Sequence, residues 1–410
     1  MSFLFLTGSR FNQFGLGTVS VDPAEAAVAP KANLYDSDPS TPHIAGSIQA
    51  DSYMRVNCNA LTNGSFEAST LSGWTDNDTG TGASTETTAG GEYRTGSKAL
   101  SLAGPDASNR ASRYQDITVN AGESRKASLY INASGGGDAR LYIQNRNTGK
   151  YLSTTGAWGT SRTHATAATG AGSFTLRSIT YQVESLDACL SDTVVLRWEI
   201  YCIDGTAFVD DCLDVPAVTF ASIHGHNYAP TLSPLVQSSD DGSSWTTRAT
   251  MTIQRPAFYS TFGAIYAEYW QIKLSGAPLE APYTGEAVLG QYREGSTQIA
   301  AGPMPTWDIP GVRSAGTIGR PMVYNFATDA TESIRLVFSG DSETEAREAV
   351  FGMFVRSGQG RYPVIIVPTD TETFVYYGRL MQPFSLERPA LGIYDWGIDL
   401  VGDPFPTVGA

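Results

Sequence analysis

Turn-forming residues interrupt the chain every eight to fifteen residues between residues 61 and 217, and no other feature restricts its fold as much. The segments between the turns are short and alternate apolar with polar side chains, as half-buried β-strands do. The 42 Gly, 20 Tyr and 17 Phe residues also favour strands and turns over helices. We therefore predict a sandwich or jelly roll. Its predicted strands are 99–104, 112–119, 126–133, 139–146, 194–201 and 205–214.

Strand signals also occur on both sides of this region. Residues 52–57 alternate, which puts Tyr53 and Arg55 on one face of a strand and Met54 and Val56 on the other. Residues 218–247 and 265–292 carry further strand and turn signals. The chain of 410 residues is long enough for two or three domains. The sequence thus predicts a mainly β, multi-domain protein.

The charge of the chain excludes one class of partner. The net charge is −14, from 27 basic and 41 acidic residues, and no Lys/Arg cluster is present. Nucleic-acid binding depends on contacts between basic side chains and phosphates, so we expect no nucleic-acid partner. No stretch approaches the roughly 20 apolar residues of a membrane-spanning helix, and we expect no membrane insertion. The N-terminus lacks the basic start of a signal peptide, which predicts synthesis in the cytoplasm without secretion by that route.

Residues 61–217 resemble the carbohydrate-binding modules of the family 4/9/22 type. The resemblance rests on NGSFEASTLSGW at 63–74, on RTGSKALSL at 94–102 and on FVDD at 208–211. It implies a jelly roll whose final strand carries the paired acidic residues.

The flanking segments resemble a discoidin-like, galactose-binding-type sandwich. The resemblance rests on the GHN turn at 225–227, the turn SDDGSSW at 239–245, the strand 269–274 and the closing AVLGQY at 287–292. The first strands of such a sandwich are missing after residue 217, and the segment before residue 61 can supply them. We therefore interpret 61–217 as a module inserted into a split sandwich formed by 32–60 and 218–295. Residues 1–31 are interpreted as an N-terminal arm.

Residues 296–410 form the last predicted domain. Ser342 to Glu345 is a capping box, and the apolar periodicity behind it, from Ala346 to Phe354, predicts a helix. Strands are predicted at 362–369, 374–381 and 392–402. A helix followed by hairpins and a long final strand resembles the barrel of phage tail-tube and distal-tail proteins.

The combination of pieces resembles the tail-tip or minor tail proteins of tailed bacteriophages. This resemblance implies a non-catalytic structural component of the virion whose inserted module is a candidate for contacting host-surface glycans. The expected partners are other phage tail proteins and further copies of the chain, as a homo-oligomer of three or six. The alternative is a non-catalytic polysaccharide-binding protein of a glycan-degrading system.

A structural calcium ion is the first candidate site, and it follows from the resemblance to carbohydrate-binding modules. The positions that match are Glu67 and Asp211, with Asn63 and Asp210 as further ligands. Calcium takes six to eight oxygen ligands, which carboxylates and carbonyls provide. The alternative is that these are solvated acids in turns.

A sugar site is the second candidate. It requires aromatic rings beside amides, carboxylates or Arg, because sugars have apolar C–H faces ringed by hydroxyls. We expect Trp74 and Trp198 to be core residues and Tyr142 and Trp158 to be exposed. The predicted site residues are Tyr142, Trp158, Tyr151, Arg140 and Gln144.

Other sequence features give no active site. The four cysteines, Cys58, Cys189, Cys202 and Cys212, match no zinc or redox spacing; free thiols are expected, and a bridge among the last three stays open. His224 and His226 are expected in a turn at the end of a strand rather than on a metal. No nucleophile elbow or catalytic triad is present, which predicts that the protein is not an enzyme.

Overall fold

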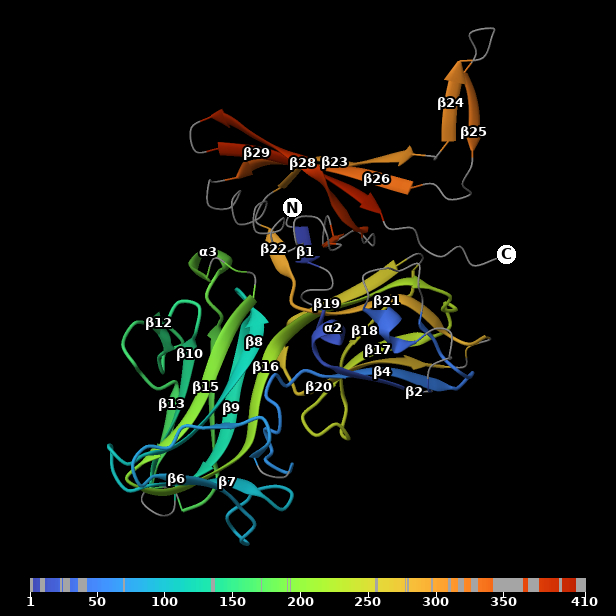
Figure 1. Cartoon of the computed structure of the whole chain (residues 1–410). Helices are drawn as coiled ribbons and strands as arrows, with labels where there is room; N and C mark the ends of the chain where they lie inside the picture. Colours follow the sequence, from blue (N-terminus) through green and yellow to red (C-terminus); the bar gives the residue numbers. More distant parts are fainter. Residues whose placement is uncertain are drawn as a thin grey trace. The chain divides into compact units, whose positions relative to one another are not determined.

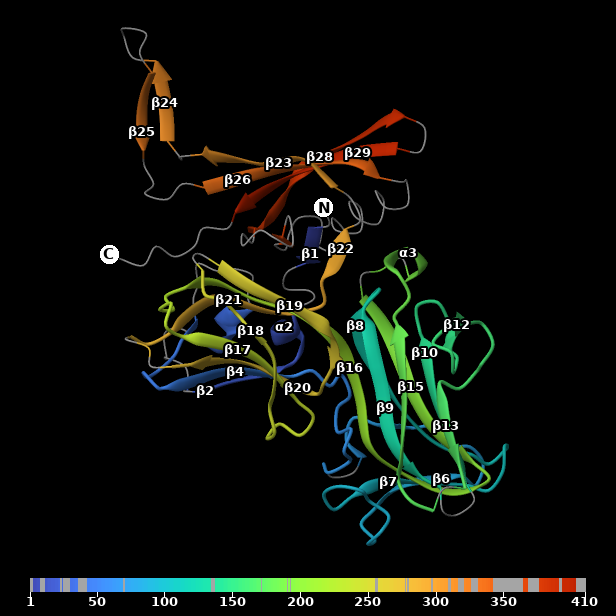
Figure 2. The same cartoon turned by 180° about the vertical axis from the view of Figure 1, so that it is seen from behind.

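The computed structural model shows a mainly β protein, as the sequence predicts (Figures 1 and 2). Two compact units make up the chain: Cys58–Ala217 with Ile265–Glu268, and the remaining residues. For residues 3–7 and from 293 onward, only the backbone of strands is described. The described residues are 3–7, 12–22, 24, 30–35, 43–68, 71–133, 137–170, 172–189, 191, 193–254, 257–276, 278, 280–295, 298–308, 311–315, 321–325, 331–341, 364–367, 376–390 and 393–402.

The unit Cys58–Ala217, called the module below, has two antiparallel sheets. The first has the order β12-β11-β10-β15-β8-β5, and β13 also pairs with β10. Its strands are β5 (Thr75–Asp76), β8 (Ala111–Asn120), β10 (Asp138–Asn145), β11 (Tyr151–Leu152), β12 (Trp158–Gly159), β13 (Thr166–Thr169) and β15 (Thr193–Ile203).

The second sheet of the module has the order β14-β9-β16-β7-β6. Each of the six strands predicted within residues 99–214 is confirmed, most of them to within two residues at either end. The short helix α3 (Leu186–Cys189) precedes β15 in the chain. The strands are β6 (Ala83–Thr87), β7 (Ala99–Gly104), β9 (Ser124–Asn132), β14 (Thr175–Gln182) and β16 (Gly205–His226).

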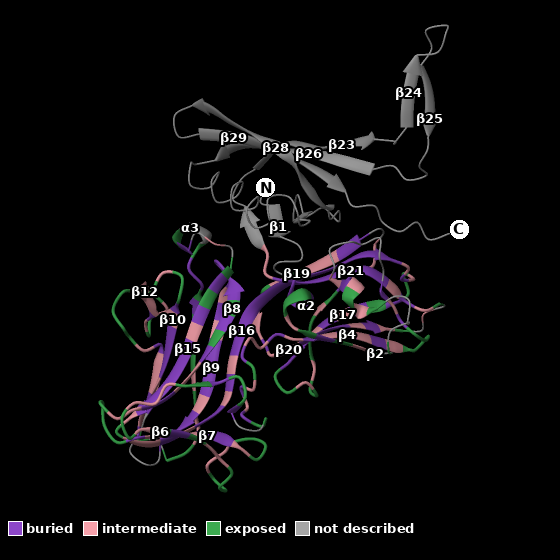
Figure 3. Ribbon diagram, in the orientation of Figure 1, coloured by how far each residue is buried: buried purple, intermediate pink, exposed green. Residues whose placement is uncertain are grey.

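The alternation of side chains produces the module's core. On β15, Leu196, Trp198 and Ile200 are fully buried, and the alternation of a strand puts the residues between them on the other face. Figure 3 shows buried residues along β8, β9, β15 and β16. Trp74 is 6% exposed and Trp198 0%, so both are core residues, as expected. All four cysteines are buried free thiols, which confirms the simpler of the two expectations.

A buried ion pair lies inside this core. The carboxylate of Asp214 accepts hydrogen bonds from Arg125 Nε at 2.6 Å, from Tyr181 Oη at 2.7 Å and from Trp198 Nε1 at 2.6 Å. Arg125 also pairs with Glu123 at 2.7 Å. Asp214 and Arg125 are both almost inaccessible to solvent. Charges in such an interior are tolerated only when each is paired and hydrogen-bonded, and these are.

Strand β16 is longer than the sequence predicts. Its residues Gly205 to Pro216 belong to the module and pair with β7 and β9. Its residues Phe220 to His226 belong to the second unit and pair there with β21 (Tyr283–Gly290). A bulge shifts the register between Asp210 and Leu213. His224 and His226 lie within this strand, not in a turn after it.

The second unit contains a sandwich, called the split sandwich below. One sheet has the order β18-β17-β20-β4-β2, and the facing strands are β19, the second half of β16, β21 and β3. The bounds are β2 (Thr18–Asp22), β3 (His43–Ile44), β4 (Asp51–Asn57), β17 (Ser233–Ser239), β18 (Thr246–Thr250), β19 (Ala257–Tyr266) and β20 (Tyr269–Ser275).

Residues 12–22 of the segment interpreted as an arm belong to this sandwich. Strand β2 pairs with β4 along its whole length, after the short helix α2 (Gln13–Leu16). Asn12 is fully buried: its Nδ2 donates to Ala287 O, and its Oδ1 accepts from Leu289 N. At Gly17, a Cβ atom would lie 2.2 Å from the Asn57 carbonyl oxygen, so only glycine fits there. A 3₁₀ helix, η1, follows at Lys31–Leu34.

The C-terminal strands form a sheet in the order β22-β1-β27-β28-β29-β26-β23. The first strand of the chain pairs here with β22 and β27. The predicted helix from Ser342 to Phe354 lies outside the described residues. A separate hairpin joins β24 and β25. The bounds are β1 (Phe3–Thr7), β22 (Arg293–Gly295), β23 (Gln298–Asp308), β24 (Gly311–Ala315), β25 (Pro321–Asn325), β26 (Thr331–Asp341), β27 (Val364–Val367), β28 (Tyr376–Ala390) and β29 (Ile393–Gly402).

Within the part of the chain that the structure describes, no helix has the length and apolar character to cross a membrane.

Candidate functional site

Tyrosines and arginines gather on the outer face of the module's first sheet. On β10, β15 and β8, every second residue points away from the core, and the strand registers put these residues side by side. Tyr142 lies opposite Glu199, and Glu199 lies opposite Tyr114. We call this surface the tyrosine–arginine face. It comprises Tyr114, Arg140, Tyr142, Gln144, Tyr151, Arg162, Arg197, Glu199 and Tyr201.

Stacked rings form the centre of the tyrosine–arginine face. Tyr142 and Tyr201 stack with ring centroids 4.8 Å apart, and their hydroxyl oxygens are 2.5 Å apart. Tyr151 meets the Tyr142 ring edge-on at 6.5 Å, as His164 does at 6.3 Å. Burial, together with the hydrogen bond to Tyr142, raises the pKa of Tyr201 to about 12. The Tyr201 hydroxyl therefore stays protonated at neutral pH.

Arg162 covers these rings and connects them to a buried carboxylate. Its guanidinium carbon lies 4.8 Å from the centroid of Tyr142, within the range of a cation–π contact. Its Nη2 donates to Glu199 at 2.8 Å. Glu199 is only 8% exposed and also accepts from Asn77 Nδ2 and Ser112 Oγ. The carboxylate thereby fixes the guanidinium, whose side chain is still 37% exposed.

Two further ion pairs complete the tyrosine–arginine face. Arg140 pairs with Asp138 on the same strand. Arg197 makes a two-pronged pair with Asp116, with both bonds at 2.8 Å, and lies 3.8 Å from the centroid of Tyr114. The hydrogen bonds from Arg197 lower the pKa of Asp116. Each arginine of this face thus has a carboxylate partner.

Four of the five predicted sugar-site residues lie together on this face. Tyr151 faces Gln144 across β10 and β11, and Tyr142 and Arg140 precede Gln144 on β10. Trp158 is not among them. It pairs with the buried Leu152, donates from Nε1 to Gln182 O at 2.8 Å and packs against the core.

Tyr142 differs from the expectation in another respect. It was expected to be exposed, but only 5% of it is accessible. Its neighbours Tyr151, Tyr201 and Arg162 cover most of the ring. A ligand would therefore meet Tyr151 and Arg162 first.

The prediction from sequence missed the other members of the face, although a signal for them was present. Arg197, Glu199 and Tyr201 alternate with the buried Leu196, Trp198 and Ile200. The same alternation puts Ser112, Tyr114 and Asp116 on one side of β8. Alternation identifies the shared face of each strand. It does not identify which strands are neighbours, so the pairing of Glu199 with Arg162 could not be predicted.

The predicted calcium ligands lie around the loop 91–98. Glu67 accepts from the backbone N–H groups of Ser97 and Lys98, both at 2.9 Å. Asp210 accepts from the N–H groups of Arg94 at 2.8 Å and Thr95 at 3.1 Å. Burial raises the pKa of Asp210 to about 6, against the lowering effect of these two N–H groups.

Asp211 and Asn63 are also engaged within the chain. Asp211 pairs with Arg94 Nη1 at 2.6 Å and accepts from Thr95 Oγ1 at 2.7 Å. Asn63 Oδ1 accepts from Ala68 N, and its carbonyl accepts from Trp74 Nε1. Both residues have positive φ, at 48° and 52°.

The four side chains do not fit a calcium ion in this arrangement. Hydrogen donors and the Arg94 guanidinium occupy the carboxylate oxygens that the cation needs. No group of three or more His, Cys, Asp or Glu side chains with metal-binding geometry occurs among the described residues. The predicted calcium ion would therefore require a rearrangement of the loop 91–98, and a test is given below.

The histidines do not form a ligand site. His224 Nε2 lies 2.8 Å from Ser222 Oγ, and His226 Nε2 lies 2.8 Å from Gln254 O. Burial lowers the pKa of His224 to about 3, so its ring is neutral. Both side chains are part of the sandwich interior.

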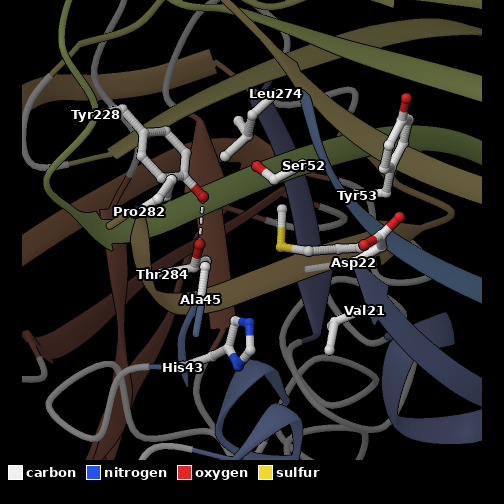
Figure 4. A pocket seen from close by; sticks show the side chains of 11 residues that line it. Val21, Asp22, His43, Ala45, Ser52, Tyr53, Tyr228, Leu274, Pro282 and Thr284 are labelled. Atoms are coloured by element: carbon white, nitrogen blue, oxygen red, sulfur yellow. Dashed lines mark hydrogen bonds between the residues drawn. The ribbon is translucent and has the colours of Figure 1, made fainter. Parts of the chain in front are cut away.

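A small pocket in the split sandwich also has polar walls (Figure 4). Tyr228 and Thr284 are hydrogen-bonded to each other across it, and His43 lies at its other end. The cavity volume is about 20 Å³. That is room for about one water molecule and far too little for a sugar.

Comparison with protein-family models and with curated proteins found no match for this chain. Solved structures gave similarities of low score. The enzymatically active domain of tailspike protein 4 from bacteriophage CBA120 is 14% identical, with a TM-score of 0.30; the match covers 39% of this chain and only 21% of that one. A module named TmCBM61, in complex with beta-1,4-galactotriose, is 17% identical with a TM-score of 0.29 over 38% of this chain and 98% of that one.

A third similarity is the N-terminal CBM22 tandem domain of Xyn10C from Paenibacillus barcinonensis. It is 10% identical with a TM-score of 0.28, over 57% of this chain and 98% of that one. Identities and scores of this size establish neither a family nor a function for this chain.

Proposed function

We propose that the module binds a carbohydrate through the tyrosine–arginine face. The observation that carries this proposal is the cluster of Tyr142, Tyr151 and Tyr201 under Arg162, on the outside of a rigid sheet. Aromatic rings pack against the C–H faces of sugars, and fixed polar groups beside the rings bind the hydroxyls. Gln144 supplies an amide next to the rings, the guanidinium groups supply donors, and Glu199 fixes the Arg162 guanidinium.

The charges of the face favour a neutral ligand. Arg140, Arg162 and Arg197 are each paired with a carboxylate, so the basic groups of the face are compensated within the chain. An acidic sugar would have to displace one of these pairs. We therefore expect neutral oligosaccharides to bind better than acidic ones.

Two substitutions in the full chain test this site. Tyr151→Ala and Arg162→Ala remove the more accessible ring and donor, and each should weaken binding of a neutral oligosaccharide by about tenfold. Calorimetric titration with xylohexaose, cellohexaose, maltohexaose and β-1,4-galactotriose measures the affinities. Leu176→Ala is the control, since Leu176 is 47% exposed on β14 of the other sheet. Equal affinities in all three variants and the wild type would reject the tyrosine–arginine face as the site.

The larger role that we propose is structural, in the particle of a tailed bacteriophage. The module would contact host glycans, and residues 296–410 would contact other tail proteins and further copies of the chain, in a ring of three or six. Support comes from the pattern of long strands that the sequence predicted at 374–381 and 392–402, which occurs as β28 and β29. The sheet ends in β22 and β23, and such edge strands can pair with another chain. Several copies on one particle would raise a modest single-site affinity through avidity.

The alternative is a non-catalytic polysaccharide-binding protein of a glycan-degrading system, which the tyrosine–arginine face fits equally well. Mass spectrometry of purified virions and electron microscopy with an antibody against this chain separate the two roles. The structural role requires the chain in the particle. Its absence there, together with retained glycan binding, would favour the alternative.

Both roles are proposed as non-catalytic. Incubating the full chain with each bound oligosaccharide and measuring new reducing ends tests this. Release of reducing ends, lost in the Glu199→Gln variant, would show a hydrolase instead.

A further inference from the structure

A second outward sheet face, on the split sandwich, carries aromatic and amide side chains. Strand β4 alternates as the sequence predicts: Met54 and Val56 are buried, whereas Tyr53 and Arg55 are partly exposed. The register puts Arg55 opposite Gln271 on β20, and Gln271 opposite Gln237 on β17. We call this surface the Arg55 face. It comprises Asp22, Asp51, Tyr53, Arg55, Gln237, Trp245, Thr247, Tyr269, Gln271 and Lys273.

A chain of hydrogen bonds crosses four strands beneath this face. Arg55 Nε donates to Gln271 Oε1 at 2.7 Å, and Gln271 Nε2 donates to Gln237 Oε1 at 2.5 Å. Gln237 Nε2 then donates to Thr247 Oγ1 at 2.9 Å. Gln271 is 1% exposed, so the series of hydrogen bonds passes through a buried amide. Such a network holds the Arg55 side chain in one place.

Arg55 keeps donors for a ligand. Among the described residues, the bond from Nε is the only hydrogen bond of this guanidinium, which leaves its two terminal amino groups available. Two aromatic rings flank it. The guanidinium carbon lies 4.5 Å from the Tyr53 centroid and 5.4 Å from the Trp245 centroid. Both rings are half-buried, so each presents part of its surface to solvent.

The third ring of the face, Tyr269, lies beside a tight turn. A Cβ atom on Gly242, whose φ is 69°, would lie 3.6 Å from the ring of Tyr269. The turn is fixed by Asp241, which accepts from the N–H groups of Ser243 and Ser244 at 2.8 and 2.7 Å. These hydrogen bonds lower the pKa of Asp241. The predicted turn at 239–245 is thus confirmed, and Trp245 is its last residue.

The charges of the Arg55 face balance. Lys273 pairs with Asp51 at 3.0 Å, and Asp22 lies opposite Tyr53 on β2. The face therefore has two basic residues, Arg55 and Lys273, and two acidic ones. A strongly charged ligand gains little there, whereas ring faces and directional donors suit a neutral polyhydroxyl compound.

We infer that the Arg55 face is a second carbohydrate-binding site, for neutral saccharides. The sugar ring packs against Trp245 and Tyr53, and Arg55 donates to its hydroxyls. This site lies on a different unit from the tyrosine–arginine face and does not depend on it. A chain with two sites would bind a polysaccharide at two points, which raises its apparent affinity.

The test uses the full chain with Tyr151→Ala and Arg162→Ala already present, so that binding at the module cannot mask the second site. Into this background we place Trp245→Ala, Trp245→Phe, Arg55→Ala and the control Ser243→Ala, which alters the same turn without touching a ring. The probes are xylohexaose, cellohexaose, maltohexaose and β-1,4-galactotriose, with an oligogalacturonate as the acidic probe. Calorimetry gives the affinities, and thermal unfolding shows that each variant is folded.

We expect at least one neutral probe to bind the background protein. Trp245→Ala and Arg55→Ala should each weaken that binding by about tenfold, whereas Trp245→Phe and Ser243→Ala should leave it within about twofold. Three results would overturn the inference: no neutral probe binds, Trp245→Ala binds as the background does, or the acidic probe binds more tightly than every neutral one. None of them bears on the tyrosine–arginine face, which is tested with the Arg55 face intact.

Discussion

Asp214 shows how much of this fold depends on single residues that the sequence does not mark. Its carboxylate is the common acceptor for Arg125, Tyr181 and Trp198 in the interior of the module. In the sequence it is the third acid of FVDDCLD, and no local pattern distinguishes its role from that of the two before it. Yet Asp211 takes a partly exposed ion pair in the loop region, whereas Asp214 neutralises a buried arginine. The bulge between Asp210 and Leu213 produces this difference by changing the register of β16.

Replacing Asp214 by alanine should destabilise the module strongly. The change leaves the Arg125 guanidinium buried with only Glu123 as a charged partner, which typically costs about 3–5 kcal/mol. Calorimetric unfolding of the full chain should show the module's transition at a much lower temperature. Asp116→Ala is the matched control, because it breaks the more exposed pair with Arg197 and should cost under about 1 kcal/mol. Similar losses in both variants would argue against the buried pair as a determinant of stability.

At the scale of elements, strands were predictable and their partners were not. Alternation located β4, β7 and β10 almost to the residue, because each has one buried face. The strand register determines the direction of the Trp158 side chain. Trp158 pairs with the buried Leu152, so its side chain points toward the core and away from Tyr151. Strand β2 was missed because TVSVD is short and comes directly after the short helix α2.

The calcium prediction depends on the loop 91–98. Its N–H groups and Arg94 already satisfy Glu67, Asp210 and Asp211, so we expect no added stability from calcium. Thermal unfolding of the full chain should give the same Tm in EDTA and in excess calcium. A ligand bound only to the folded state would raise the Tm by mass action. A higher Tm in calcium, abolished by Glu67→Ala or Asp211→Ala, would restore the metal site and show that the loop rearranges around it.

For the whole molecule, the relevant observation is that the module is one compact unit. Its residues, Cys58–Ala217, are almost continuous in the chain, whereas the split sandwich takes strands from both sides of them. From the sequence, 61–217 is interpreted as an inserted module because the segments on both sides resemble parts of one sandwich. Contacts over such distances leave no mark in a local pattern, which is why the pairing of β1 with β27 could not be predicted.

Deleting Cys58–Ala217 and joining the ends with a short Gly/Ser bridge should leave a folded split sandwich. The five strands β2, β4, β17, β18 and β20 lie outside the deletion and keep their pairing. Circular dichroism and a cooperative thermal melt of the purified remainder measure this. The isolated module should unfold cooperatively too. A remainder that aggregates while the isolated module folds would mean that the sandwich needs the module.

The separation of β4 from β20 also sets an order of events on the ribosome. Asn57 pairs with Tyr269, which is 269 − 57 = 212 residues later. At a translation rate of roughly 5–20 residues per second, β20 is synthesised roughly 10–40 s after β4. The module has all its strands within that interval and can fold first. The folded module holds its two ends close together. The loop between β4 and β20 then closes at the entropic cost of a short loop rather than that of a loop of about 200 residues. Slow folding of the module would therefore appear as late, error-prone assembly of the sandwich around it.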